Sequence, residues 1–117
     1  MNEVSELSID VEALPLKAVA ELLGIPVTRV HQHLRDGLYL AFRRDGEACV
    51  PAAFFHGKSV VKGLQGTIVL LRDGGFADPE ILRWLFTEDD SLPGTPIECL
   101  RAGRHREVKR RAQAMAF

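Results

Sequence analysis

The sequence predicts a mainly α-helical fold with one small β-hairpin, on two observations. Apolar residues recur at helical spacing in several segments bounded by glycine or proline, and one Asp-Gly pair separates two short strand-like runs. The chain has 117 residues, of which 46% are hydrophobic. That length suffices for one compact core, or for a small domain with an appended module, and excludes two large independent domains.

The first two predicted helices meet at a tight corner. Residues 16–23 place their apolar side chains on one stripe, formed by Leu16, Val19, Ala20, Leu22 and Leu23. Gly24 accepts the left-handed conformation that ends a helix, and Pro26 fixes φ for the start of the next helix. We therefore expect a helix-turn-helix, although this spacing alone also fits any small α-helical domain.

The second helix has a polar outer face. Val27, Val30 and Leu34 are expected to face the protein. Arginine and glutamine bind base edges with two hydrogen bonds, threonine suits phosphate oxygens, and a recognition helix uses its N-terminal half for bases. The predicted DNA contacts on this face are Thr28, Arg29, His31, Gln32 and Arg35, of which Thr28, Arg29 and Gln32 are the strongest candidates for the groove.

A two-stranded hairpin is predicted after the helix pair. Strands over residues 40–43 and 47–50 flank the turn formed by Asp45 and Gly46. Arg43 and Arg44 lie beside this turn, where long cationic side chains reach phosphates or the minor groove. The order helix, turn, helix, hairpin is that of a winged helix-turn-helix, with the hairpin as the wing.

The run VAELLGIPVTRVHQHLRDGLYLAFRRDGEACVP resembles the excisionase and MerR-like winged helix-turn-helix group, over residues 15–55. His33 departs from the pattern, because an apolar or aromatic residue is more usual there. The resemblance implies binding to specific double-stranded DNA sites without catalysis.

A helical C-terminal module over residues 63–117 is expected to pack on this winged part, which we assign to residues 14–62. A continuous apolar run makes the segment from Leu64 to Gly74 its central helix. Asp78 is the predicted N-cap of a second helix, and the Thr-Pro-Ile-Glu run from Thr95 is a capping box that opens a third.

Residues 104–117 form a basic amphipathic helix with Val108, Ala112 and Met115 on one stripe. Its cationic residues are Arg104, Arg106, Lys109, Arg110 and Arg111. Three uses stay open: phosphate contacts, docking on the acidic segment 73–98 of the same or a second subunit, or plain solvation.

The second half has two resemblances of its own. The run from Gly63 to Phe117 that contains WLF and ends in RRAQAMAF looks like the C-terminal part of a small actinobacterial family of winged-helix DNA-binding proteins. With the helix-turn-helix this likeness spans residues 14–117 and implies a DNA-binding regulator. The shorter run WLFTEDDSLPGTPIECLRAGRHREV is similar to the toxin-binding region of some antitoxins, which implies a protein partner.

Charge is segmented along the chain, although the net charge is only −1. Residues 16–64 hold seven bases against four acids, and residues 101–117 hold six bases against one acid. Residues 1–15 hold four acids and no base, and residues 73–98 hold seven acids and one base. The near-neutral total therefore does not exclude binding to phosphates, which local basic stretches drive.

Several classes of function are disfavoured. Cys49 and Cys99 are isolated and read as small buried residues, so neither a disulfide framework nor a zinc site is expected. The sequence has neither a Ser/His/Asp arrangement nor a glycine-rich phosphate-binding loop, so neither an enzyme nor a cofactor is expected. The acidic N-terminus has no long apolar run, which predicts a cytoplasmic protein without membrane contact. Residues 1–13 are expected to be a disordered acidic tail in which Ser5 and Ser8 are candidate phosphorylation sites.

We therefore predict a DNA-binding protein, a transcriptional regulator with a recognition helix in the major groove and an arginine-bearing wing. The alternative is a protein-interaction module of antitoxin type, in which residues 64–117 bind a protein partner or a second copy of the chain.

Overall fold

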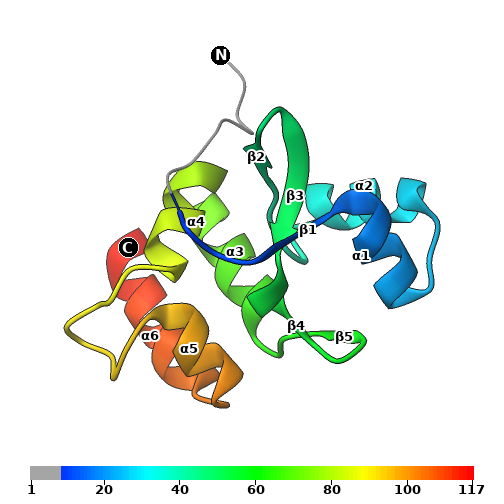
Figure 1. The fold of residues 1–117 in the computed structure, drawn as a ribbon. Helices are drawn as coiled ribbons and strands as arrows, with labels where there is room; N and C mark the ends of the chain where they lie inside the picture. The colour runs from blue at the N-terminus through cyan, green and yellow to red at the C-terminus, as the bar shows by residue number, and fades with distance from the viewer. Residues whose placement is uncertain (1–8) are drawn as a thin grey trace.

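The computed structural model describes residues 9–117, which form six α-helices and two small antiparallel sheets (Figure 1). In chain order the elements are β1 Ala13–Pro15, α1 Leu16–Leu23, α2 Val27–Arg35, β2 Phe42–Arg44, β3 Glu47–Pro51, the 3₁₀ turn Ala52–Phe54, β4 Phe55–His56, β5 Ser59–Val60, α3 Leu64–Asp73, α4 Asp78–Leu85, α5 Pro96–Arg101 and α6 His105–Ala116. Helices α1 and α2 lie on one side of the molecule, α4 to α6 lie on the other, and α3 lies between them (Figure 1). The predicted fold class is confirmed.

The helix-turn-helix forms as its spacing predicts. Gly24 has φ +69° and ends α1, and the N–H of Ile25 closes the turn by donating to Ala20 O at 3.0 Å. Val30 of α2 is fully buried. The expectation that Val27 faces the protein is wrong: it is 39% exposed, because it is the first residue of α2 and lies at the open end of the helix.

The wing is a three-stranded sheet rather than a lone hairpin. Asp45 and Gly46 both have positive φ, and this two-residue turn joins β2 to β3 in the predicted way. The first strand starts two residues later than predicted, at Phe42, and ends one residue later, at Arg44. The third strand of this sheet, β1, was not predicted; it pairs with the other edge of β3 and places Leu14 opposite Val50.

The N-terminal segment differs from the expected tail in its last residues. Ile9, Val11 and Ala13 pack against the core, so the chain lies on the fold from residue 9 onward. Residues 1–8, which include the candidate phosphorylation sites Ser5 and Ser8, lie outside the described residues.

One hydrophobic core runs through both halves of the chain. It is formed by buried side chains between Val19 and Ala112, including those of Ile68 and Leu71 on α3. Cys49 and Cys99 are part of it, and burial raises the pKa of both thiols. The predicted role of the cysteines as small buried residues is confirmed.

Helix starts in the second half follow one prediction and contradict another. Thr95 Oγ1 accepts the N–H of Glu98 at 3.2 Å, and the Glu98 carboxylate accepts the N–H of Thr95 at 2.9 Å, which is the predicted capping box. Asp78 is not an N-cap: α4 is capped by Ala77, whose N–H donates to the Glu80 carboxylate at 2.8 Å.

Candidate nucleic-acid interface

The N-terminal half of α2 is an exposed face of hydrogen-bond donors. Thr28, Arg29 and His31 are exposed, and within residues 9–117 their side chains make no hydrogen bond. The first turn of α2 contains no acidic residue. The positive end of the helix dipole and the free N–H groups of this turn therefore point at solvent without a neutralising charge, which suits an anion.

The C-terminal half of α2 holds its polar side chains in a surface network. Arg35 Nη2 donates to Gln32 Oε1 at 2.7 Å, and Gln32 Nε2 donates to Asp36 Oδ1 at 3.1 Å. Gln32 and Arg35 are exposed, so a ligand can compete for these bonds. Five of the seven predicted contact residues thus share one helix, although two of them are linked to each other.

His33 connects α2 to the core, which explains how the fold accommodates its departure from the family pattern. Its Nδ1 lies 3.0 Å from the hydroxyl of the buried Tyr39, and the two rings meet edge to face with centroids 5.7 Å apart. Burial raises the pKa of Tyr39 to about 12, so the phenol stays protonated. Burial, and then the charge of Arg29, lowers the pKa of His33, which favours the neutral imidazole. The tautomer of that ring decides which of the two groups donates.

At the wing tip, the arginines are only half-exposed, and each binds a carbonyl of its own chain. Arg43 Nη1 donates to Gly46 O at 2.9 Å. Arg44 Nη2 donates to Ile9 O at 3.1 Å, and its guanidinium carbon lies 5.1 Å from the centroid of the Phe42 ring. The predicted wing cations are therefore engaged within the fold, unlike the side chains of the first turn of α2.

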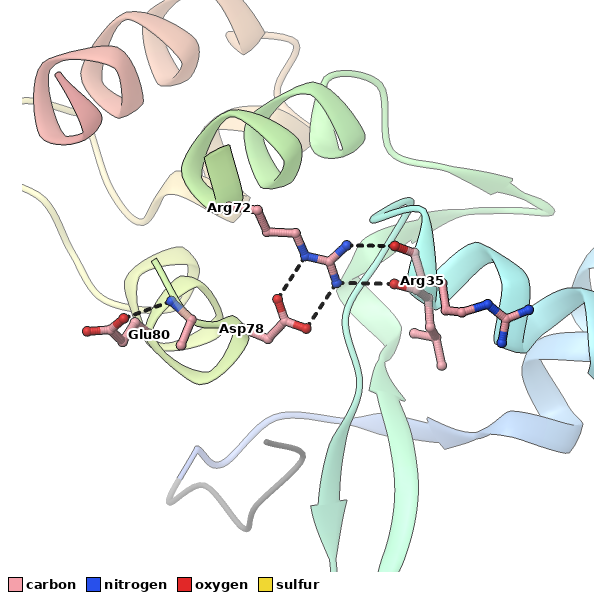
Figure 2. Close-up of polar contacts among 6 residues, drawn as sticks. Arg35, Arg72, Asp78 and Glu80 are labelled. Atoms are coloured by element: carbon pink, nitrogen blue, oxygen red, sulfur yellow. Dashed lines mark hydrogen bonds and ion pairs between the residues drawn. The ribbon is translucent and has the colours of Figure 1, made fainter. Parts of the chain in front are cut away.

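A residue that the sequence did not single out, Arg72 of α3, contacts the C-terminal end of α2 (Figure 2). Its guanidinium donates to Arg35 O at 3.0 Å and to Leu34 O at 3.1 Å. The same group binds both carboxylate oxygens of Asp78 at 2.9 Å. Arg72 and Asp78 are six residues apart across a Gly-Gly turn, a separation with no periodic signal that would have predicted the pair.

An ion pair joins the basic helix α6 to the acidic segment. Arg111 Nε donates to Asp89 Oδ2 at 3.0 Å, and Trp84 Nε1 donates to the same oxygen at 3.1 Å. Hydrogen bonds from Ser91 are the main reason that the pKa of Asp89 is held far below its usual range. Arg106, Lys109 and Arg110 are exposed on the outer side of α6.

Residues 9–117 contain neither a cluster of metal ligands nor a membrane-spanning helix. No group of three or more His, Cys, Asp or Glu side chains in this part of the chain is placed to hold a metal ion. None of its helices combines the length and the apolar character needed to cross a membrane.

Comparisons with known proteins agree with this architecture. A family model described as "DNA-binding protein Rv2175c, wHTH domain" matches residues 4–55, and one described as "Rv2175c C-terminal domain of unknown function" matches residues 61–116. The DNA-binding protein Rv2175c of Mycobacterium tuberculosis (strain ATCC 25618 / H37Rv) is 46% identical over 124 residues, which cover 95% of this chain and 85% of that protein. The NMR structure of Rv2175c matches with a TM-score of 0.89 at 43% identity, covering 97% of this chain and 88% of that one. The chain therefore belongs to the Rv2175c family of winged helix-turn-helix DNA-binding proteins.

Proposed function

We propose that this protein binds specific sites in double-stranded DNA and regulates transcription, with α2 in the major groove and the wing beside it. The observation that carries the proposal is the open face at the start of α2, where Thr28, Arg29 and His31 are exposed donors without partners within residues 9–117. An α-helix fits the major groove, and arginine reads guanine there through two hydrogen bonds.

Within this proposal, Arg29 and Gln32 read bases, while Thr28 and the free N–H groups of the first turn bind a phosphate. His31 lies between Arg29 and Gln32 in the sequence of α2, and Arg35 follows Gln32 by three residues. Gln32 reaches a base by exchanging its bond with Asp36 for one with the DNA. The DNA-contacting part then lies within residues 14–62.

The wing supplies contacts that do not depend on sequence. Arg43 and Arg44 bind the phosphate backbone beside the groove after releasing Gly46 O and Ile9 O. Both acceptors are neutral carbonyls, so a phosphate, which carries a full charge, competes well for a guanidinium.

A selection experiment tests the proposal. Protein is incubated with random-sequence 30-base-pair duplexes, the bound fraction is sequenced over several rounds, and the affinity for the enriched duplex is measured by fluorescence anisotropy at several salt concentrations. We expect one enriched motif, tight binding to it, and affinity that falls as salt rises. A reporter promoter that carries the motif should change its output when the protein is expressed.

The matched control is Arg83→Ala, which removes an exposed arginine from α4. It should bind the enriched duplex as tightly as the wild type does, whereas Arg29→Ala should bind that duplex more weakly. Absence of any enriched motif would refute sequence-specific binding.

The antitoxin-type alternative has no comparable support. Two carboxylates of the acidic segment, those of Asp78 and Asp89, are paired within the chain with Arg72 and Arg111. DNA binding is therefore the function that we propose for this chain.

A further inference from the structure

We propose that Arg72 is a positioning residue for DNA binding, through which the helical C-terminal part of the chain sets the direction in which α2 meets DNA. This inference rests on the proposed function. Arg72 lies on α3, outside the predicted DNA contacts, and its side chain is about three-quarters buried, with 26% of it exposed.

The carbonyl groups at the end of α2 need partners that the helix cannot supply. Gln32 O accepts the N–H of Asp36, and Leu34 O accepts the N–H of Gly37. Among the described residues, the partner of Arg35 O is Arg72 Nη1, and Leu34 O takes a second bond from Arg72 Nη2. A guanidinium at this position also meets the negative end of the helix dipole.

Asp78 fixes the other edge of the same guanidinium (Figure 2). Because its two oxygens bind Nε and Nη2, the plane of the guanidinium cannot turn without breaking the pair. Figure 2 shows that the side chain of Arg35 itself points away from Arg72, so only its carbonyl takes part. The end of α2 is thus bound to a planar group whose orientation is set by α3 and α4.

Gly37 and Gln65 show how closely α3 approaches the same end of α2. Gly37 has φ +76°, and a Cβ atom there would lie 3.0 Å from Arg72 Nη1 and 3.3 Å from Ile68 Cγ2. Gln65 Nε2 donates to Asp36 O at 3.4 Å. The backbone after α2 therefore approaches α3 closely enough that a side chain larger than that of glycine must displace a neighbour.

Because Arg72 binds the C-terminal end of α2, a change in this contact would displace the N-terminal end of the helix. Helix α2 has nine residues, which is about 13 Å at 1.5 Å per residue. A tilt of about 10° at its C-terminal end moves its N-terminal end by about 2 Å. Hydrogen bonds to base edges tolerate much less than this, so Thr28 and Arg29 would lose register with the groove.

The experiment compares Arg72→Ala and Asp78→Asn with Arg111→Ala in the full chain. Arg111→Ala is the matched control because it breaks another Arg–Asp pair, on α6 and away from α2. For each variant, the affinities for the enriched duplex and for a scrambled duplex are measured over a range of salt. Residual dipolar couplings of backbone amides give the angle between α2 and α3, and thermal unfolding reports stability.

We expect Arg72→Ala to lower the preference for the enriched over the scrambled duplex by about tenfold, the equivalent of one lost base contact. The salt dependence should stay unchanged, since no phosphate contact is removed. Arg72→Lys should not rescue the preference, because an ammonium group cannot bind two carbonyls and a carboxylate in one plane. Asp78→Asn should show a smaller loss, and Arg111→Ala none.

An unchanged angle between α2 and α3 in a folded Arg72→Ala variant would overturn the proposal, whether or not the wild type binds DNA. A weaker salt dependence in that variant would also overturn it, because Arg72 would then be a phosphate contact. If Arg72→Ala is too unstable to study, Asp78→Asn gives the same readouts without changing a group that touches α2. Failure of the wild type to bind any duplex would refute the proposed function alone, since the angle is measured without DNA.

Discussion

The start of α2 and the tip of the wing both present cationic side chains, but they hold them differently. At the start of α2, Arg29 is exposed and its side chain makes no hydrogen bond within the described part of the chain. At the wing tip, Arg43 and Arg44 each bind a backbone carbonyl. Proximity to a recognition helix therefore does not make cations equally available, because a wing arginine must give up one bond to make another.

The largest expected effect sharpens this contrast. Replacing both Arg29 and Gln32 by alanine should weaken binding to the enriched duplex by about 1–3 kcal/mol for each lost base contact. The affinity for a scrambled duplex should fall much less, because phosphate contacts remain. Fluorescence anisotropy with both duplexes measures the two losses. Equal losses on both duplexes would contradict a base-reading role for α2.

The second prediction compares two glycines that have similar backbone angles and different surroundings. Gly37 and Gly46 have φ +76° and +81°, so alanine at either position costs about 1–2 kcal/mol of backbone strain. At Gly37 the new Cβ also crowds Arg72 and Ile68, whereas at Gly46 it meets no atom within 4 Å.

We expect the free energy of unfolding to fall by about 3 kcal/mol for Gly37→Ala and by about 1 kcal/mol for Gly46→Ala. Urea denaturation of both variants checks the difference. Equal values would show that the end of α2 has as much room as the wing tip.

The third prediction concerns Arg44. Arg44→Ala should weaken binding to all duplexes alike and reduce the slope of log affinity against log salt by about 0.9, the value for one phosphate. Loss of its bond to Ile9 O should also lower the free energy of unfolding by about 0.5–1.5 kcal/mol. Arg44→Lys is the control, because it keeps the charge and loses the geometry of the Phe42 contact. A full salt slope in Arg44→Ala would exclude a phosphate contact.

The smallest expected effect is a pH dependence at the contact between α2 and the core. The pKa of His33 is lowered from 6.5 in the folded protein, mainly by burial, so the unfolded chain binds more protons just below that value. The contribution of His33 to stability is therefore fully present above pH 6.5 and is lost as the pH falls through and below it.

Urea denaturation at about pH 7.5 and about pH 5.5 should show a larger drop for the wild type than for His33→Gln. His33→Gln leaves every other side chain unchanged, so the difference between the two proteins isolates His33. Tyr39→Phe should keep the dependence, because burial rather than the hydrogen bond is the main cause of the shift. An identical drop in His33→Gln would show that the dependence arises elsewhere.

Local chemistry accounts for the parts of the fold that the sequence predicted. The Asp45-Gly46 turn, the end of α1 at Gly24 and the capping box at Thr95 each depend on residues within five positions of one another. Side chains that near in sequence meet in whichever fold the chain adopts, so their residue types suffice to predict them.

Contacts between distant segments account for what the sequence did not predict. Strand β1 forms by pairing with β3, about 36 residues further along the chain, and a three-residue strand has no periodicity to reveal it. The short hairpin of β4 and β5 has only two residues in each strand. Asp78 was predicted to be the N-cap of α4 from the residues that follow it. In the structure its carboxylate instead forms an ion pair with Arg72. The roles of the seven predicted contact residues in DNA binding stay predictions.

The shared core has a consequence for how the chain unfolds. The segment between the two regions matched by the family models is not a linker, because the two halves touch directly beside it. Phe54, at the end of the first region, packs against Phe86 of the second, with ring centroids 5.7 Å apart. Two halves that share one hydrophobic core unfold together, so heat or urea should unfold the chain in a single cooperative transition. Cutting the chain at this boundary would expose core side chains on both fragments, so neither fragment would keep a complete hydrophobic core.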